Sequence, residues 1–324
     1  MFIADGVSLP QLYAAYTANG GRLNIFNMPY SGVSNTSSFD AYITDSAPGS
    51  TAFSSGKKTR NAYVGVDESG NALRLLPALL ADRGKQTALL TSGDVTDATP
   101  ADFYVHATDR NDSGKIIRFF KDSGVRYLVG GPSEGWQPSM KSFFQSEGVS
   151  VYEGLDFWEP DGRKTLVMYA LASETVLGRR GDWMRRAYTK LLDAIRKNDK
   201  GFFFVVEASR TDIGGHWRDL PYLVSELQEM DNLVGEALRF SDQDGETLVV
   251  VVGDHETGGL TLFGGDFQKK QVFGQFSTMD HTALPALVFA YGPGAEEFTG
   301  FYENTAVFHK LLKGMGFLIN ENEK

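Results

Sequence analysis

The sequence contains no cysteine among its 324 residues. Disulfide bonds and thiolate metal sites are therefore excluded, so a metal centre here would have to use carboxylate, imidazole or hydroxyl ligands. Histidine is also scarce, and its five copies leave few candidates for such a site. No apolar run approaches about eighteen residues, so we expect no transmembrane helix.

The chain also lacks an excess of positive charge. Its 31 lysines and arginines are outnumbered by 41 aspartates and glutamates, which gives a formal net charge of −10. This balance argues against a nucleic-acid partner and against binding to an anionic membrane. A hydrophobic content of 42% is enough for a large core, and no repeat or low-complexity linker divides the chain. We expect a single domain over residues 1–324.

Apolar stretches typical of buried strands alternate with stretches of helical periodicity. This alternation predicts an α/β three-layer sandwich, with helices on both faces of a mostly parallel central sheet. The expected strands are 87–90, 127–129, 165–169, 202–206, 247–252 and 286–290. The expected helices are 73–83, 116–122, 182–197, 223–240 and 305–315.

One expected strand ends in two adjacent metal-ligand types. Four valines, at positions 249–252, run into Gly253, Asp254 and His255. Ligands bind at the carboxyl ends of strands in open α/β sheets, and a carboxylate beside an imidazole suits zinc. A capped turn is the alternative interpretation of this pair.

The same pattern recurs at three other strand ends. Helix capping or turn chemistry could explain each of them separately, but four such coincidences favour a site with several metal ions. Asp212 and His216 are four residues apart, so one helical face or one loop could bring them to the same ion. The residues concerned are Asp5; Asp97 and Thr99; and Glu207 with Asp212 and His216.

Of the three remaining histidines, we expect one to be a metal ligand. His281 lies in a loop just before a strand expected at 284–290, as a ligand would. His309 falls in the last expected helix, and His106 in a short helix expected at 101–106. We expect structural roles for these two.

Ser46 lies among small and polar residues typical of a tight strand-to-helix turn. At a helix N-terminus, free backbone N–H groups and the helix dipole would favour a bound oxyanion. Coordination to zinc would lower the pKa of the serine hydroxyl and make it a competent nucleophile. A simple N-cap role for Ser46 is compatible with the same geometry.

Taken together, these motifs resemble the alkaline phosphatase family. They follow the family's order and span nearly the whole chain. The matching blocks are Ile3-Ala4-Asp5-Gly6, Thr44-Asp45-Ser46-Ala47, Gly56-Lys57-Lys58-Thr59, Asp97-Ala98-Thr99-Pro100, Thr108-Asp109-Arg110, Val206-Glu207 with Asp212 and His216, Gly253-Asp254-His255-Glu256-Thr257-Gly258-Gly259, and Asp280-His281-Thr282.

The resemblance implies hydrolysis of small phosphate monoesters through a covalent phosphoserine on Ser46. It implies one zinc, held by Asp212, His216 and His281, that activates the attacking water. A second zinc, held by Asp5, Asp254 and His255, would bind the Ser46 oxygen. One magnesium would be held by Asp5, Thr99 and Glu207, with Asp97 behind these ligands. Arg110, oriented by Asp45, would clamp two phosphoryl oxygens.

The resemblance also implies a location and leaves assembly open. A periplasmic or extracellular enzyme is expected, although no signal peptide is visible. Residues 1–6 read as the end of a strand, so we expect the N-terminus to be truncated. The short stretch between His255 and His281 predicts that the crown insertion of many relatives is short or absent. A homodimer remains open.

Three alternatives remain. A sulfatase-like enzyme is suggested by Ser46-Ala47-Pro48-Gly49-Ser50, although Ser50 stands where that pattern has arginine. A phosphodiesterase of the same superfamily would share the zinc ligands but generally lacks the magnesium set and the arginine clamp. The third alternative is a non-catalytic metal- or phosphate-binding protein.

Two residues near the expected zinc ligands depart from the family's pattern or add to it. Ile213 stands where many relatives carry a lysine or histidine that contacts phosphate through water. Its apolar side chain is expected to weaken phosphate binding. Trp217, beside His216, could line the site or serve ordinary packing.

Overall fold

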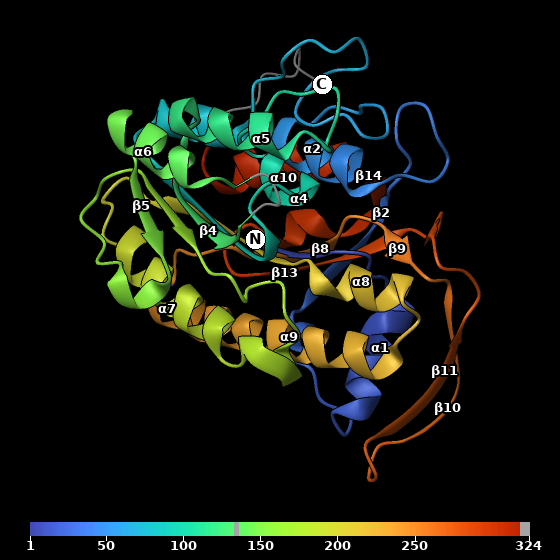
Figure 1. Ribbon diagram of the computed structural model, residues 1–324. Helices are drawn as coiled ribbons and strands as arrows, with labels where there is room; N and C mark the ends of the chain where they lie inside the picture. Colours follow the sequence, from blue (N-terminus) through green and yellow to red (C-terminus); the bar gives the residue numbers. More distant parts are fainter. Residues whose placement is uncertain (133–135, 318–324) are drawn as a thin grey trace.

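The computed structural model describes residues 1–132 and 136–317. A ten-stranded sheet forms the middle layer and helices cover both of its faces (Figure 1), which confirms the expected α/β sandwich. The strand order is β14-β2-β13-β8-β1-β7-β3-β4-β6-β5. Only β13 runs against its two neighbours, whereas the other pairs are parallel. These strands are β1 (Phe2–Ala4), β2 (Tyr30–Asn35), β3 (Gln86–Asp94), β4 (Val125–Gly131), β5 (Ser150–Glu153), β6 (Thr165–Met168), β7 (Phe202–Ala208), β8 (Val249–Gly253), β13 (Ala286–Tyr291) and β14 (Gly300–Glu303).

Alternating side chains of each central strand enter two separate cores. In β7, Phe203 and Val205 pack in one layer, while Phe204 and Val206 pack in the other. Because both faces are covered, central strands such as β7 and β8 carry apolar side chains on both sides, as expected for buried parallel strands. The helices are α1 (Leu9–Ala18), α2 (Ser46–Ser55), α3 (Leu76–Ala81), α4 (Ala98–Ala101), α5 (Ser113–Ile116), α6 (Pro138–Ser146), α7 (Trp183–Ile195), α8 (Arg210–His216), α9 (Leu220–Asp244) and α10 (Thr305–Gly314).

The helices fall on the two sides of the sheet. Helices α2, α6 and α10 lie on one side, and α1, α7 and α9 on the other (Figure 1). Short helical turns complete the chain: η1 (Ile25–Asn27), η2 (Ile117–Asp122), η3 (Leu155–Phe157), η4 (Val176–Arg180) and η5 (Ala295–Phe298). No helix within residues 1–132 and 136–317 is long and apolar enough to span a membrane.

All six expected strands are present, with ends shifted by up to four residues. Two expected helices are wrong. Residues 117–122 form a 3₁₀ helix, and the helix expected at 101–106 is a turn that follows α4. In this turn the N–H groups of Phe103 and Tyr104 bond to carbonyls three residues back, and a single bond from the Val105 N–H to the carbonyl four residues back does not extend the helix.

Two small sheets extend from the main one. A hairpin of β10 (Leu260–Asp266) and β11 (Gln271–Phe276) projects beside α1 (Figure 1), and β9 (Glu256–Thr257) pairs with β12 (His281–Thr282). The β9–β12 pair places His281 opposite Thr257, close to His255. This pairing brings the two parts of the expected metal site together.

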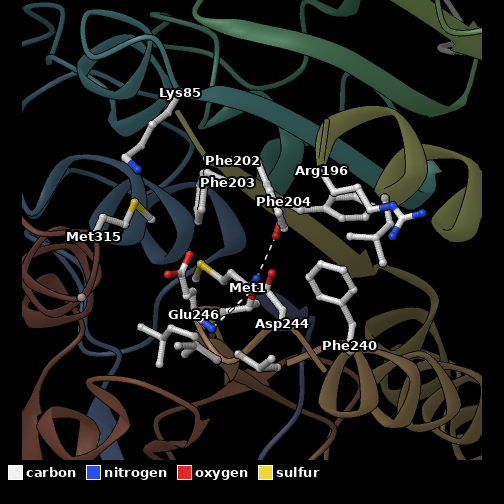
Figure 2. Close-up of a pocket in the computed structure, with 18 of the residues that line it drawn as sticks. Met1, Lys85, Arg196, Phe202, Phe203, Phe204, Phe240, Asp244, Glu246 and Met315 are labelled. Carbon is white, nitrogen blue, oxygen red and sulfur yellow. Dashed lines mark hydrogen bonds between the residues drawn. The ribbon is translucent and has the colours of Figure 1, made fainter. Parts of the chain in front are cut away.

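A cavity of about 450 Å³ lies at the amino end of the short central strand β1 (Figure 2). Met1 lies in it and its nitrogen donates to the Phe204 carbonyl at 2.8 Å. None of the expected site residues lines this cavity. Asp5 follows the other end of β1, so the cavity and the candidate site occupy opposite edges of the sheet.

Candidate active site

The candidate site lies across the carboxyl ends of four neighbouring strands, β8, β1, β7 and β3. Asp254 and His255 follow β8, Asp5 follows β1, and Glu207 lies near the end of β7. Gly6, with φ of +71°, turns the chain immediately after Asp5. A Cβ atom at Gly6 would lie 2.7 Å from the Asp212 carboxylate, so only glycine lets the strand end pass this close.

The first ligand group contains Asp212, His216 and His281, whose ligand atoms lie within 4.8 Å of one another. Helix α8 carries Asp212 and His216 on one face, as their spacing predicted, and His216 Nε2 is 3.1 Å from Asp212 Oδ2. His281 arrives from β12, with its Nε2 3.2 Å from His216 Nε2. The fold thus brings His216 and His281, which are 65 residues apart in the chain, into one cluster.

Backbone carbonyls set the orientation of both imidazoles. His216 Nδ1 is 2.5 Å from the Met279 carbonyl, and His281 Nδ1 is 2.9 Å from the Thr44 carbonyl. A carbonyl only accepts, so each Nδ1 carries the proton and each Nε2 presents a lone pair to the cluster. Two facing lone pairs beside a carboxylate require a cation between them, which is the donor set of a zinc site.

The second ligand group contains Asp5, Asp254 and His255, all buried. His255 Nε2 lies 3.4 Å from Asp5 Oδ1 and from Asp254 Oδ2. These two carboxylate oxygens accept no hydrogen bond from any described residue. Buried carboxylate oxygens are costly unless they are paired, so this group also fits a divalent cation.

Thr99 and Glu207 provide a third set of oxygens next to Asp5. Both side chains are buried, and neither Thr99 Oγ1 nor Glu207 Oε1 forms a hydrogen bond within the described part of the chain. The other Glu207 oxygen accepts a hydrogen bond from Thr91. An all-oxygen set of hydroxyl and carboxylates suits magnesium better than zinc.

The electrostatics of these groups favour the binding of cations. Burial raises the pKa of Asp5 well above its usual range, that of Asp254 to about 7 and that of Glu207 to about 8, and neighbouring carboxylates add to each rise. Burial lowers the pKa of His255. The hydrogen bond to Asp212 raises the pKa of His216 to about 9, so a proton can take a cation's place there.

Ser46 is the first residue of helix α2, and its Oγ lies 3.1 Å from His255 Nε2. Asp45, not Ser46, is the N-cap, because its side chain accepts a hydrogen bond from the Ala47 N–H at 3.2 Å. The N-cap interpretation of Ser46 is therefore wrong. This arrangement leaves the serine hydroxyl free to face the second ligand group.

Arg110 joins the N-terminus of α2 to Asp97, the N-cap of α4. Its guanidinium is 2.9 Å from Asp97 Oδ1 and 3.4 Å from Asp45 Oδ2. Burial alone would lower the pKa of Arg110, but Asp97 and Asp45 raise it above its ordinary value. Asp45 was the expected neighbour of the arginine, whereas Asp97 was expected behind the magnesium ligands; both carboxylates hold the guanidinium charged and oriented.

Sequence reasoning missed the hydroxyls and carboxylates that support the site. Thr257 donates to Asp212 Oδ1 and lies 3.2 Å from His255 Nδ1, so it joins the two ligand groups. Glu256 is buried and accepts hydrogen bonds from Gln11, Thr282 and the Leu260 N–H, which holds β9, β12 and α1 together. Nothing in the sequence marked these roles, because the partners are far apart along the chain.

Asp102 is a further residue that the sequence did not single out. It is fully buried below α2, where its Oδ1 accepts hydrogen bonds from Thr51 Oγ1 at 2.5 Å and from the Gly65 N–H at 3.2 Å. Burial raises the pKa of this carboxyl well above its usual range, which favours the neutral acid. Asp102 thereby ties the helix of Ser46 to the segment that follows Thr99.

Replacing Asp102 with alanine is expected to destabilise the fold by about 2–3 kcal/mol, because the buried Thr51 hydroxyl would lose its acceptor and the Gly65 N–H one of its two acceptors. Asp102→Asn keeps an acceptor of the same shape and should lose less than half of that. Urea unfolding midpoints at neutral pH measure the difference. Equal loss in both variants would show that the hydrogen bonds to Thr51 and Gly65 are not what the carboxyl contributes.

Comparisons with known proteins agree with this geometry. The family model for alkaline phosphatase matches residues 1–126 and 184–275. The chain belongs to the alkaline phosphatase family. Its fold matches the alkaline phosphatase of the Antarctic bacterium TAB5 with a TM-score of 0.90 and 32% identity, over 98% of this chain and 97% of that one. Alkaline phosphatase 4 of Bacillus subtilis is 24% identical over 97% of this chain and 88% of its own length.

Family membership confirms the expected fold and class of activity. The chain is a hydrolase of phosphate monoesters, as its relatives named alkaline phosphatase indicate. A cold-active alkaline phosphatase from a psychrophilic Shewanella species shares the fold at a TM-score of 0.88 and 22% identity, over 97% of this chain and 98% of that one. The likeness thus extends to the whole architecture that positions the site.

Proposed function

We propose that this alkaline phosphatase works through a covalent phosphoserine on Ser46 at a centre of two zinc ions and one magnesium ion. The observation that carries the proposal is the position of Ser46 Oγ, 3.1 Å from His255 Nε2 and beside buried carboxylate oxygens without hydrogen-bond donors. A serine in ordinary packing would not need such neighbours. A nucleophile activated by a cation would.

The residues divide among three cations. Asp212, His216 and His281 would hold one zinc, and Asp5, Asp254 and His255 the other. Thr99 and Glu207, with Asp5, would hold magnesium, and Asp97 lies behind them. When bound, these ions supply Lewis acidity, which lowers the pKa of hydroxyl groups and offsets phosphoryl charge. A variant of the TAB5 enzyme is described with magnesium bound in a site called M3, which supports a magnesium subsite.

The chain's own groups position the phosphoryl transfer. Ser46 Oγ gives up its proton to solvent and forms a bond to phosphorus as the bond to the ester oxygen breaks. The leaving oxygen takes a proton from water and departs as the alcohol on the opposite side. Arg110, oriented by Asp45 and Asp97, donates to two phosphoryl oxygens through its planar guanidinium. Water then attacks phosphorus, releases inorganic phosphate and returns the serine. Ser46 is next to the second ligand group, so the leaving oxygen faces Asp212, His216 and His281.

Other features of the enzyme follow from the same resemblance. We propose a single catalytic domain in which the β10–β11 hairpin occupies the place of the larger crown insertion. We also propose a periplasmic or extracellular location. A homodimer would be compatible with the single domain and with this location.

Turnover of matched substrates tests the proposed function. Hydrolysis of an aryl phosphate monoester should exceed that of the corresponding diester and sulfate ester by on the order of 10³-fold in kcat/KM. A diester preference would favour the phosphodiesterase alternative, and a sulfate preference the sulfatase alternative. If none of these three substrates is hydrolysed when metal ions are supplied, the non-catalytic alternative would be favoured.

Ile213 provides a sharper prediction for phosphate release. Its half-buried side chain is in α8, one residue after Asp212, and offers no charge to a bound phosphate. Ile213→Lys should lower the inhibition constant for inorganic phosphate by about fivefold, as expected for one added water-mediated contact to a charge. Ile213→Met is the uncharged control. Equal inhibition constants in the two variants would contradict the proposed role of this position.

A further inference from the structure

Helix α8 presents a second face beside its metal-ligand face. Asp212 and His216 share one stripe, and Ile213 and Trp217 share the next, rotated by one residue. Trp217 has helical backbone angles as the C-cap of α8, so this spacing holds to the end of the helix. Its side chain therefore lies near the expected zinc ligand His216 yet points along a different direction. The residue is 61% exposed.

The indole of Trp217 is held in place rather than free to rotate. It stacks on Tyr222 with ring centroids 5.6 Å apart and an interplanar angle of 29°. Arg210 donates from Nε to the Tyr222 hydroxyl at 2.8 Å, and its guanidinium carbon is 5.8 Å from the indole centroid. Tyr222 and Arg210 thus support the ring by packing. A large part of it still faces solvent.

Beside Trp217 the surface is hollowed. An open depression of about 550 Å³ lies between the α8–α9 connection and the end of β11, and Trp217, Arg218, Pro221, Gln275 and Phe276 are among its lining residues. Apolar ring surface and an exposed guanidinium occur together there. Flat aromatic ligands are recognised by such a combination, through stacking and through cation–π contact.

We propose that Trp217 forms a leaving-group subsite for phosphate monoesters whose alcohol carries a nucleobase. The inference rests on the proposed function, in which the leaving oxygen faces the group that contains His216. The depression beside Trp217 reaches Gln275 and Phe276, three residues before Met279, whose carbonyl contacts His216 Nδ1. An alcohol that extends from this group toward the end of β11 therefore passes the exposed indole. A nucleobase joined through its ribose can stack there, whereas a bare sugar phosphate cannot.

Adenosine 5′-monophosphate and ribose 5-phosphate form a matched pair for the test. Both present the same primary ester oxygen on a ribose, so they differ in the base alone. The parent enzyme is expected to show a kcat/KM for the nucleotide about tenfold above that for the sugar phosphate, as stacking on one aromatic side chain allows. Trp217→Ala should remove this preference by lowering the nucleotide value alone. Trp217→Phe should retain most of it.

Phe301→Ala is the matched control, because Phe301 is also exposed but belongs to the edge strand β14. It should leave both substrates unchanged. An equal kcat/KM for both substrates in the parent would overturn the inference while leaving the proposed function intact. So would an equal fall for both in Trp217→Ala, which would indicate a structural role. Failure of the parent to hydrolyse either substrate would instead contradict the proposed function.

Discussion

Replacing Ser46 with alanine is expected to lower kcat/KM for an aryl phosphate by on the order of 10⁴-fold, because the variant has no oxygen to form the covalent intermediate. The buried ligand groups would remain, since among the residues that the structure describes the Ser46 hydroxyl has a single hydrogen-bond partner, His255 Nε2. Initial rates under saturating zinc and magnesium measure the loss. Acid-quenched parent enzyme should carry one phosphoryl group on Ser46, and the variant none.

Ser50→Ala is the control for this substitution. Ser50 lies one turn further along α2 and is fully buried, and its hydroxyl makes no hydrogen bond to described residues. Its replacement should change kcat/KM by less than about twofold. If Ser46→Ala instead retained more than about a tenth of the parent activity, the covalent route would be wrong, and direct attack by water would have to replace it.

Removal of metal ions is expected to have an effect of similar size and a characteristic pH dependence. Chelation should lower kcat/KM by on the order of 10³-fold or more, and zinc with magnesium should restore it. Stability should change as well. Burial raises the pKa of Asp254 from its ordinary value of 3.8 to about 7, and that of Glu207 from 4.5 to about 8. In the metal-free protein these carboxyls hold protons that the unfolded chain has already released.

The free energy of unfolding of the metal-free protein should therefore decrease as pH rises from about 4 to about 8. Bound cations stabilise the ionised carboxylates, so the loaded enzyme should show no such decrease. Between pH 6 and pH 8.5 the melting temperature of the chelated protein should fall by at least about 4 °C. A melting temperature that is independent of pH in this range, or falls equally with metals bound, would contradict the assignment of Asp254 and Glu207.

The central part of the fold could be predicted because its signal is local. Four valines before Asp254 and three phenylalanines before Glu207 mark strands covered on both faces. The hairpin β10–β11 was missed because its strands are half exposed and interrupted by glycines, so neither an apolar run nor a clear alternation appears. Helix α1 was missed for a related reason: its exposed face carries Leu9 and Tyr13 while Gln11 and Thr17 are buried, so polarity does not follow the amphipathic pattern.

The ligand types could be predicted from the strand ends, but their support could not. The spacing of Asp212 and His216 predicts that they share a ligand site. The hydrogen bond from Thr91 to Glu207, in contrast, joins residues 116 positions apart in the chain. The sequence does not distinguish the buried Asp102 from a solvent-exposed carboxylate at the end of a helix. Only packing shows that its oxygen accepts from Thr51 and Gly65. Hydrogen bonds between residues this far apart produce no periodic pattern in the sequence from which they could be predicted.

Elemental analysis of the purified enzyme tests the central claim most directly. After equilibration with both metals and removal of excess, the parent should contain two zinc ions and one magnesium ion per chain. Glu207→Gln should lose the magnesium and keep both zincs, because Glu207 lies outside the two histidine-containing groups. A parent enzyme with full phosphatase activity but less than one tightly bound divalent ion per chain would contradict the account.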